Sequence, residues 1–316
     1  MTADPGLEER ITGCLVGAAI GAELGFARCV EPERFAATGP EGIFEVELTA
    51  TQSYRPQPHW TVLRSADALV HLGVRAYLAS DGRATPEGFG ELLRRDEGVA
   101  FPAWRWDGLH TVQEVLKEGM HPRLSGLGTC PCGLICAAMP AVGVYHFAHP
   151  DYAYLDGVEL ASVAQGRLGA DWAGLCAAAI AAAFEKGATG EGVVDAVMKI
   201  AFENCRELFY ELDWVLRRTN GLSEEAFLEQ WCRDGGAPQL GRDNYWVAYN
   251  PLRFVLGLLS RYAGEPEKLL ALLVVPPPFL YVPTISAVIG GAVAGAIHGP
   301  GGFSKAWRGW AEPIAQ

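Results

Sequence analysis

Apolar side chains recur every three or four positions along most of this chain, and alternating patterns typical of strands are nearly absent. Ile11, Leu15 and Ala22 share one face of a predicted helix over 9–24. The same spacing predicts further helices over 61–79, 133–147, 157–165, 170–186, 191–204, 206–217, 223–233, 245–263, 267–274, 284–298 and 303–311. Only Phe44–Leu48 carries a weak strand pattern. The pattern therefore predicts an all-α protein that folds as one compact domain over 1–316.

Two of the predicted helices carry a small residue at every fourth position. These residues are Gly13, Gly17, Gly21 and Gly25 in one helix and Gly291, Gly295 and Gly299 in the other. A glycine costs a helix about 1 kcal/mol relative to alanine, so a repeated glycine is tolerated where another backbone approaches closely. We expect these two helices to pack tightly against each other at the centre of the fold, and we do not expect the glycines to bind a ligand.

Composition narrows the class of protein. Half of the 316 residues are hydrophobic, and the formal net charge is −12 with no Lys/Arg cluster, which argues against binding to nucleic acid or to an anionic membrane. The eight cysteines do not form a short secreted framework, and Cys14 and Cys176 lie within apolar helical patterns. No signal peptide and no apolar stretch of roughly 20 residues is seen. We expect a reduced, cytoplasmic protein.

Four segments carry motifs in a fixed order. They read RITGCLVGAAIGAELG at 10–25, HWTVLRSADAL at 59–69, CGLICAAMP at 132–140 and YVPTISAVIGGAVAGAIHG at 281–299. These segments resemble the ADP-ribosylglycohydrolase family, whose motifs read R-x-x-G-x-L-x-G-x-A-x-G-D-A-L-G, W-T-D-D-T, N-G-x-x-M-R and G-G-D-T-D-T followed by small residues. The resemblance covers the chain from end to end. It implies the compact orthogonal multi-helix bundle of that family, with a cleft at one end.

The resembled family binds two Mg²⁺ ions in its cleft through Thr and Asp side chains, and this chain departs from that pattern. The positions that correspond to this ligand set are Cys29, Thr61, Val62, Leu63, Val282 and Thr284. None of them is a carboxylate, although Mg²⁺ requires hard oxygen ligands. No Asp or Glu lies between Leu269 and Gly302, so a shift of register does not restore one. We therefore expect no metal site and no Mg²⁺ cofactor.

Three charged residues are candidates for a metal-free site. Glu23 is the only charged residue between Ile11 and Ala27, and it is either a general acid or binding carboxylate, or an ordinary helix-end residue in a salt bridge. Arg64 and Asp67 have the spacing of a surface pair. Alternatively, Arg64 binds a phosphate or carboxylate in place of the metal ions, and Asp67 takes part in acid–base chemistry.

Cysteines and aromatic residues complete the candidate site. Cys130 and Cys132 form a C-x-C pair that is either a metal-binding, redox or nucleophilic element, or two free thiols in a loop. Thr61 is either a ligand-binding hydroxyl or the N-cap of its helix. Trp60 and Tyr281 are expected beside the cleft opening, where they would stack on a flat ligand or serve as core residues. Together with the lost carboxylates, these aromatic residues indicate a cleft that suits a less polar ligand.

Three classes of function follow. The first is an enzyme with altered, metal-independent chemistry on a small molecule, either glycoside-like, nucleoside-like or less polar, in which Glu23, Asp67, Cys130 and Cys132 are the catalytic candidates. The second is a catalytically inactive ligand-binding or scaffold protein. The third is a Mg²⁺-dependent ADP-ribosyl hydrolase whose ligands have moved elsewhere, for example to Glu23, Glu47 and Asp67. We favour the first, because aromatic and proline-rich replacements indicate an altered pocket, and we expect a small molecule as the binding partner. The sequence gives no oligomeric state.

Overall fold

The computed structural model describes residues 5–30, 61–95, 108–129, 133–233, 251–274 and 282–308. These residues form helices joined by short turns, and no strand occurs among them, so the predicted all-α class is confirmed. The weak strand pattern at Phe44–Leu48 lies outside the described residues. A search of the helices that the structure describes finds no segment able to cross a membrane.

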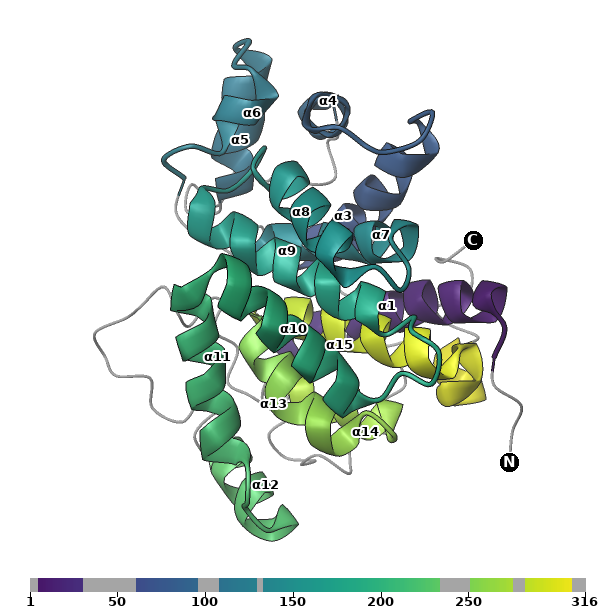
Figure 1. The fold of residues 1–316 in the computed structure, drawn as a ribbon. Helices are drawn as coiled ribbons and strands as arrows, with labels where there is room; N and C mark the ends of the chain where they lie inside the picture. The colour runs from purple at the N-terminus through teal and green to yellow at the C-terminus, as the bar shows by residue number, and fades with distance from the viewer. Residues whose placement is uncertain are drawn as a thin grey trace.

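The helices follow one another in a fixed order along the chain (Figure 1). Their bounds are α1 Leu7–Val30, α3 Thr61–Leu78, α4 Pro86–Arg95, α5 Gly108–Lys117, α6 Pro122–Ser125, the 3₁₀ helix η3 Gly133–Ala138, α7 Met139–Tyr145, α8 Pro150–Ala161, α9 Arg167–Ala182, α10 Gly190–Asn204, α11 Arg206–Thr219, α12 Glu224–Arg233, α13 Leu252–Tyr262, α14 Pro266–Val274, α15 Val282–His298 and the 3₁₀ helix η5 Pro300–Gly302.

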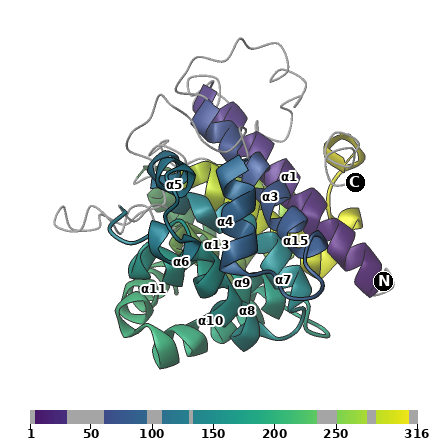
Figure 2. The same cartoon turned by 90° about the horizontal axis from the view of Figure 1, so that it is seen from above.

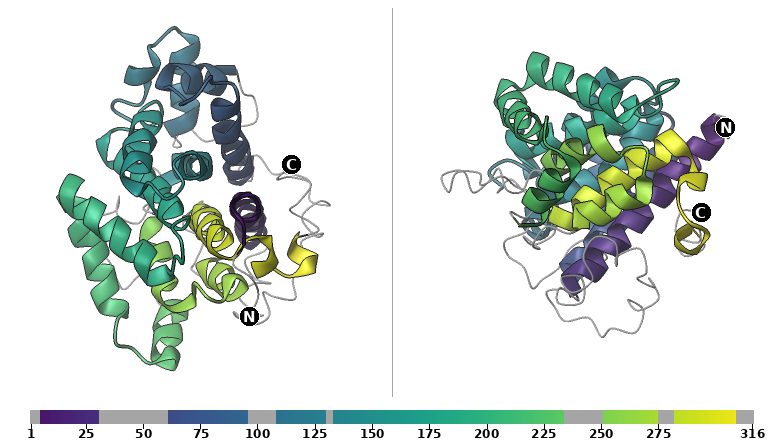
Figure 3. Two further views of the ribbon diagram at one scale, coloured as in Figure 1. Left: turned by 45° about the vertical axis from the view of Figure 1, so that its right-hand side comes forward. Right: turned by 90° about the horizontal axis from the view of Figure 1, so that it is seen from below.

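Helices α1 and α15 lie side by side through the middle of the molecule, although they come from opposite ends of the chain (Figures 1 and 3). A Cβ atom added to Gly17 of α1 would lie 2.6 Å from the carbonyl carbon of Gly291 in α15. One added to Gly13 would lie 2.6 Å from Cα of Gly299. Since carbon atoms pack at about 3.5–4.0 Å, no larger side chain fits there. The predicted close contact between the two glycine-bearing helices is confirmed.

Arg10 connects the N-terminal part of α1 to the C-terminal part of α15. Its guanidinium is buried and donates hydrogen bonds to the carbonyl of Ala296 on α15 at 2.7 Å and to the carbonyl of Ala183, just past α9, at 2.5 Å. Both carbonyls lie at helix C-termini, where a cation interacts favourably with the helix dipole. In the same region, a ring nitrogen of His298 lies 2.6 Å from the carbonyl oxygen of Ala263. This contact connects the end of α15 to the residue that follows α13.

The structure differs from the predicted helices in three places. Helices α4, α5 and α6 were not expected, because they are short and α4 contains two glycines. The segment predicted as one helix over 133–147 divides at Met139 into a 3₁₀ helix and an α-helix, since Pro140 has no N–H with which to continue the earlier turn. Helix α8 begins at Pro150, earlier than the predicted residue 157, because the apolar spacing in its first turn is weak.

Candidate functional site

The four elements that carry the sequence motifs pack together: α3 and α15 each contact α1, η3 and one another. The last turns of α1 lie beside the first turn of α15, since a Cβ atom added to Gly25 would lie 2.8 Å from Cβ of Thr284. The end of α1 also lies next to the start of α3 (Figures 2 and 3). The fold therefore brings the C-terminus of one motif helix and the N-termini of two others to the same end of the molecule.

Thr284 occupies a position at which the resembled family has an Asp, and its side chain is completely buried. Its hydroxyl oxygen would lie 2.8 Å from a Cβ atom added to Gly25, so it sits in the contact between α1 and α15. Two residues further along α15, the buried hydroxyl of Ser286 donates a hydrogen bond to the carbonyl of Pro251 at 3.1 Å. The start of α15 thus presents buried neutral hydroxyls among apolar neighbours.

Glu23 lies at the same end of α1 and is half-buried. Gly21 and Gly25 face α15, and Glu23 stands midway between them in sequence. Because successive residues of an α-helix are 100° apart, its Cβ points away from α15. Glu23 is the only carboxylate in the first motif segment. It is therefore the acidic group that α1 contributes to this end of the molecule.

Asp67 lies on α3 with 31% of its side chain exposed. One of its carboxylate oxygens is 3.8 Å from Nε2 of His71, which is one turn further along the same helix. Such a spacing is typical of a pair on a helix surface, and pairs of this kind contribute little to stability. This contact links Asp67 to its own helix, and its catalytic role stays a prediction.

The remaining candidates divide into two groups. For the first group the structure describes the backbone only. This group consists of Cys29 in the last turn of α1, Val282 at the start of α15, and Thr61, Val62, Leu63 and Arg64 in the first turn of α3. Outside the described residues lie Trp60, Cys130, Cys132 and Tyr281. Their roles in binding or catalysis stay predictions.

Among the described side chains at this end, no group of carboxylates fits a magnesium centre. In the described ranges, no three His, Cys, Asp or Glu side chains gather where they could hold a metal ion. Thr284 stands at a position where the resembled family has a metal ligand, and it is buried against Gly25. Its neutral hydroxyl does not supply the negative charge of a carboxylate ligand. We therefore derive no chemical step through Mg²⁺.

Comparison with protein families agrees with the motifs. A family model described as ADP-ribosylglycohydrolase matches residues 3–313. The chain belongs to this family. A comparison with curated proteins gives no match. The all-helical architecture of this ADP-ribosylglycohydrolase-family chain is consistent with the family's fold.

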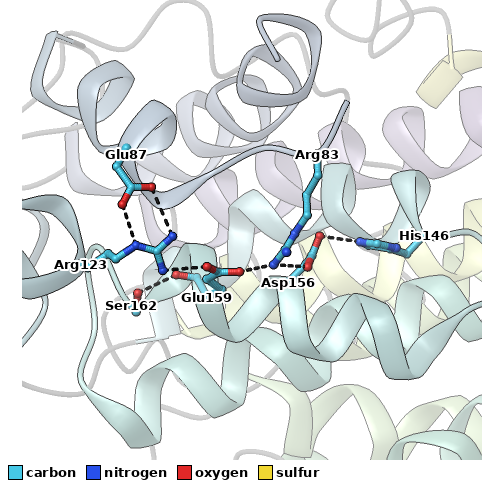
Figure 4. A network of polar contacts seen from close by, with 7 residues as sticks. All are labelled: Arg83, Glu87, Arg123, His146, Asp156, Glu159 and Ser162. Carbon is cyan, nitrogen blue, oxygen red and sulfur yellow. Dashed lines mark hydrogen bonds and ion pairs between the residues drawn. The ribbon is translucent and has the colours of Figure 1, made fainter. Parts of the chain in front are cut away.

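A second group of polar side chains was not singled out from the sequence. It connects the loop after α3 with α4, α6, α7 and α8, and consists of Arg83, Glu87, Arg123, His146, Asp156 and Glu159 (Figure 4). No local motif contains these residues, because the pairs made by Arg83 and Arg123 join elements that are distant in sequence, and only His146 and Asp156 come from neighbouring elements. The group lies near the C-terminal end of α3, because Arg83 follows that helix by a few residues.

Proposed function

We propose that this ADP-ribosylglycohydrolase-family protein acts on a small molecule in a cleft that works without Mg²⁺, at the end where α1, α3 and α15 meet. The observation that carries the proposal is the start of α15, where Thr284 is fully buried against Gly25 and no carboxylate lies between Leu269 and Gly302. A ligand at this end would therefore meet no carboxylate from α15. Such a site suits a glycoside-like or nucleoside-like compound with fewer charges than a metal-bound substrate.

Glu23 is the group we assign to acid–base chemistry. Cleaving a glycosidic bond without a Lewis acid requires a proton donor for the leaving oxygen, and a carboxylic acid in a partly apolar setting performs this role in other glycoside-cleaving enzymes. The half-buried position of Glu23 on an otherwise uncharged stretch of α1 supports this assignment. Water would then attack the anomeric carbon as the leaving group departs and would release one proton to solvent, from which the Glu23 carboxylate is protonated again for the next cycle.

A thermal-shift experiment tests the metal-free part of the proposal. Melting is recorded with and without excess Mg²⁺, and ADP-ribose is then added to each sample. A ligand that binds only the folded protein at a hundredfold excess over its Kd stabilises it by about 2.7 kcal/mol. We expect no Mg²⁺-dependent shift with ADP-ribose. A shift that requires both compounds would show that ligands for Mg²⁺ exist elsewhere in the chain, and the proposal would be wrong.

The role of Glu23 is tested by Glu23→Gln, with Glu8→Gln as the matched control on the exposed first turn of the same helix. Turnover is measured on a panel of nitrophenyl glycosides and nucleosides. We expect Glu23→Gln to lose roughly 10²–10⁴-fold in rate with little change in melting temperature, and Glu8→Gln to keep full activity. Unchanged turnover in Glu23→Gln would remove this residue from the mechanism. Absence of turnover and of any ligand shift in the wild type would instead support the catalytically inactive scaffold.

A further inference from the structure

We draw no further inference here: the strongest candidate, the exposed apolar surface patch of Tyr145, Tyr152 and Leu155 where α7 passes into α8, carries no proposal because nothing in the described part of the chain shows what covers it.

Discussion

Replacing Gly17 with alanine tests whether the contact between α1 and α15 holds the fold together. The added Cβ atom would lie 2.6 Å from the carbonyl carbon of Gly291 and 3.0 Å from the ring of Phe303. Since carbon atoms pack at about 3.5 Å or more, the two helices would have to separate by about 1 Å. The obstructing atoms are mainly backbone atoms, which cannot change rotamer to make room.

The expected size of the effect follows from two opposing contributions. Overpacking of a tight core costs about 1–3 kcal/mol, and a contact against backbone belongs at the upper end of that range. Alanine recovers about 1 kcal/mol of helix propensity relative to glycine. We therefore expect Gly17→Ala to lower the free energy of unfolding by about 2 kcal/mol or more.

Gly88→Ala on α4 is the matched control, because the same substitution there meets only the Thr85 hydroxyl at 3.5 Å. It should raise stability by up to about 1 kcal/mol. Both variants are compared with wild type by urea denaturation followed by circular dichroism, with the midpoint and slope fitted separately. If Gly17→Ala were as stable as Gly88→Ala, the close approach of α1 and α15 would be incorrect.

Two further predictions concern buried polar groups. The hydroxyl of Tyr77 is buried without a hydrogen-bond partner among the described residues, so Tyr77→Phe should raise the melting temperature, whereas Tyr154→Phe should lower it because the Tyr154 hydroxyl donates to Asp171 at 2.9 Å. A higher melting temperature in Tyr77→Phe together with a lower one in Tyr154→Phe would support this contrast, and a loss of stability in both variants would contradict it. Burial raises the pKa of Asp171 above its ordinary value of 3.8, so protonation of this carboxyl favours the folded state. The stabilisation is fully present below a pH of about 3.8, and it is lost as the pH rises through the raised pKa of the folded state. Asp171→Asn should therefore gain stability relative to wild type over that pH range in denaturation curves, and a constant difference at all pH values would show that Asp171 does not titrate there.

The central helices could be predicted from sequence because glycine at every fourth position has a specific physical cause. Only a backbone-to-backbone contact offsets the loss of helix propensity that repeated glycines bring, and both stripes face each other as expected. Helix α4 was missed because Gly88 and Gly90 weaken its apolar pattern, although Thr85 followed by Pro86 is a helix-start signal. Gly90 is present for a reason that only the fold reveals, since a Cβ there would lie 2.7 Å from Pro122 of α6.

The candidate site was less accessible to prediction than the fold. Motif order was enough to bring α1, α3, η3 and α15 together, because the matched positions are those that set helix contacts. The pairing of His146 with Asp156 and Arg83 had no such signal. Hydrophobic periodicity reports which side of a helix is buried, but it does not say which charged group from another helix will lie opposite. In the sequence, Asp156 and His146 are therefore ordinary polar positions. Only the fold shows that Oδ2 of Asp156 lies 2.6 Å from Nε2 of His146.

The fold of this chain and the metal-free chemistry that we propose for it depend on different residues. The glycine stripes and Arg10 are required by contacts within the fold, so they remain whatever the cleft does. A cluster of carboxylates is stable only while a cation balances its charge, since buried like charges repel one another and are poorly solvated. In a cleft without metal, as we propose, we therefore expect a neutral residue such as Thr284 to be more stable than Asp at a buried position. Under this proposal, the neutral residues Val62, Val282 and Thr284 would all have the same physical cause.

Thr284→Asp tests this reasoning, with Thr284→Asn as the uncharged control of the same size. The new carboxylate would lie in a fully buried position against Gly25, so its pKa should rise and the folded protein should lose about 3 kcal/mol or more at neutral pH beyond the loss in Thr284→Asn. The difference between the two variants should shrink as the pH falls and the carboxylate becomes protonated. Denaturation is measured with and without Mg²⁺, and we expect the ion to change neither variant, because one carboxylate without partners does not form a magnesium site. Recovery of Thr284→Asp by Mg²⁺ alone would show that other oxygen ligands already converge on this position, and the metal-free interpretation of the cleft would then be wrong.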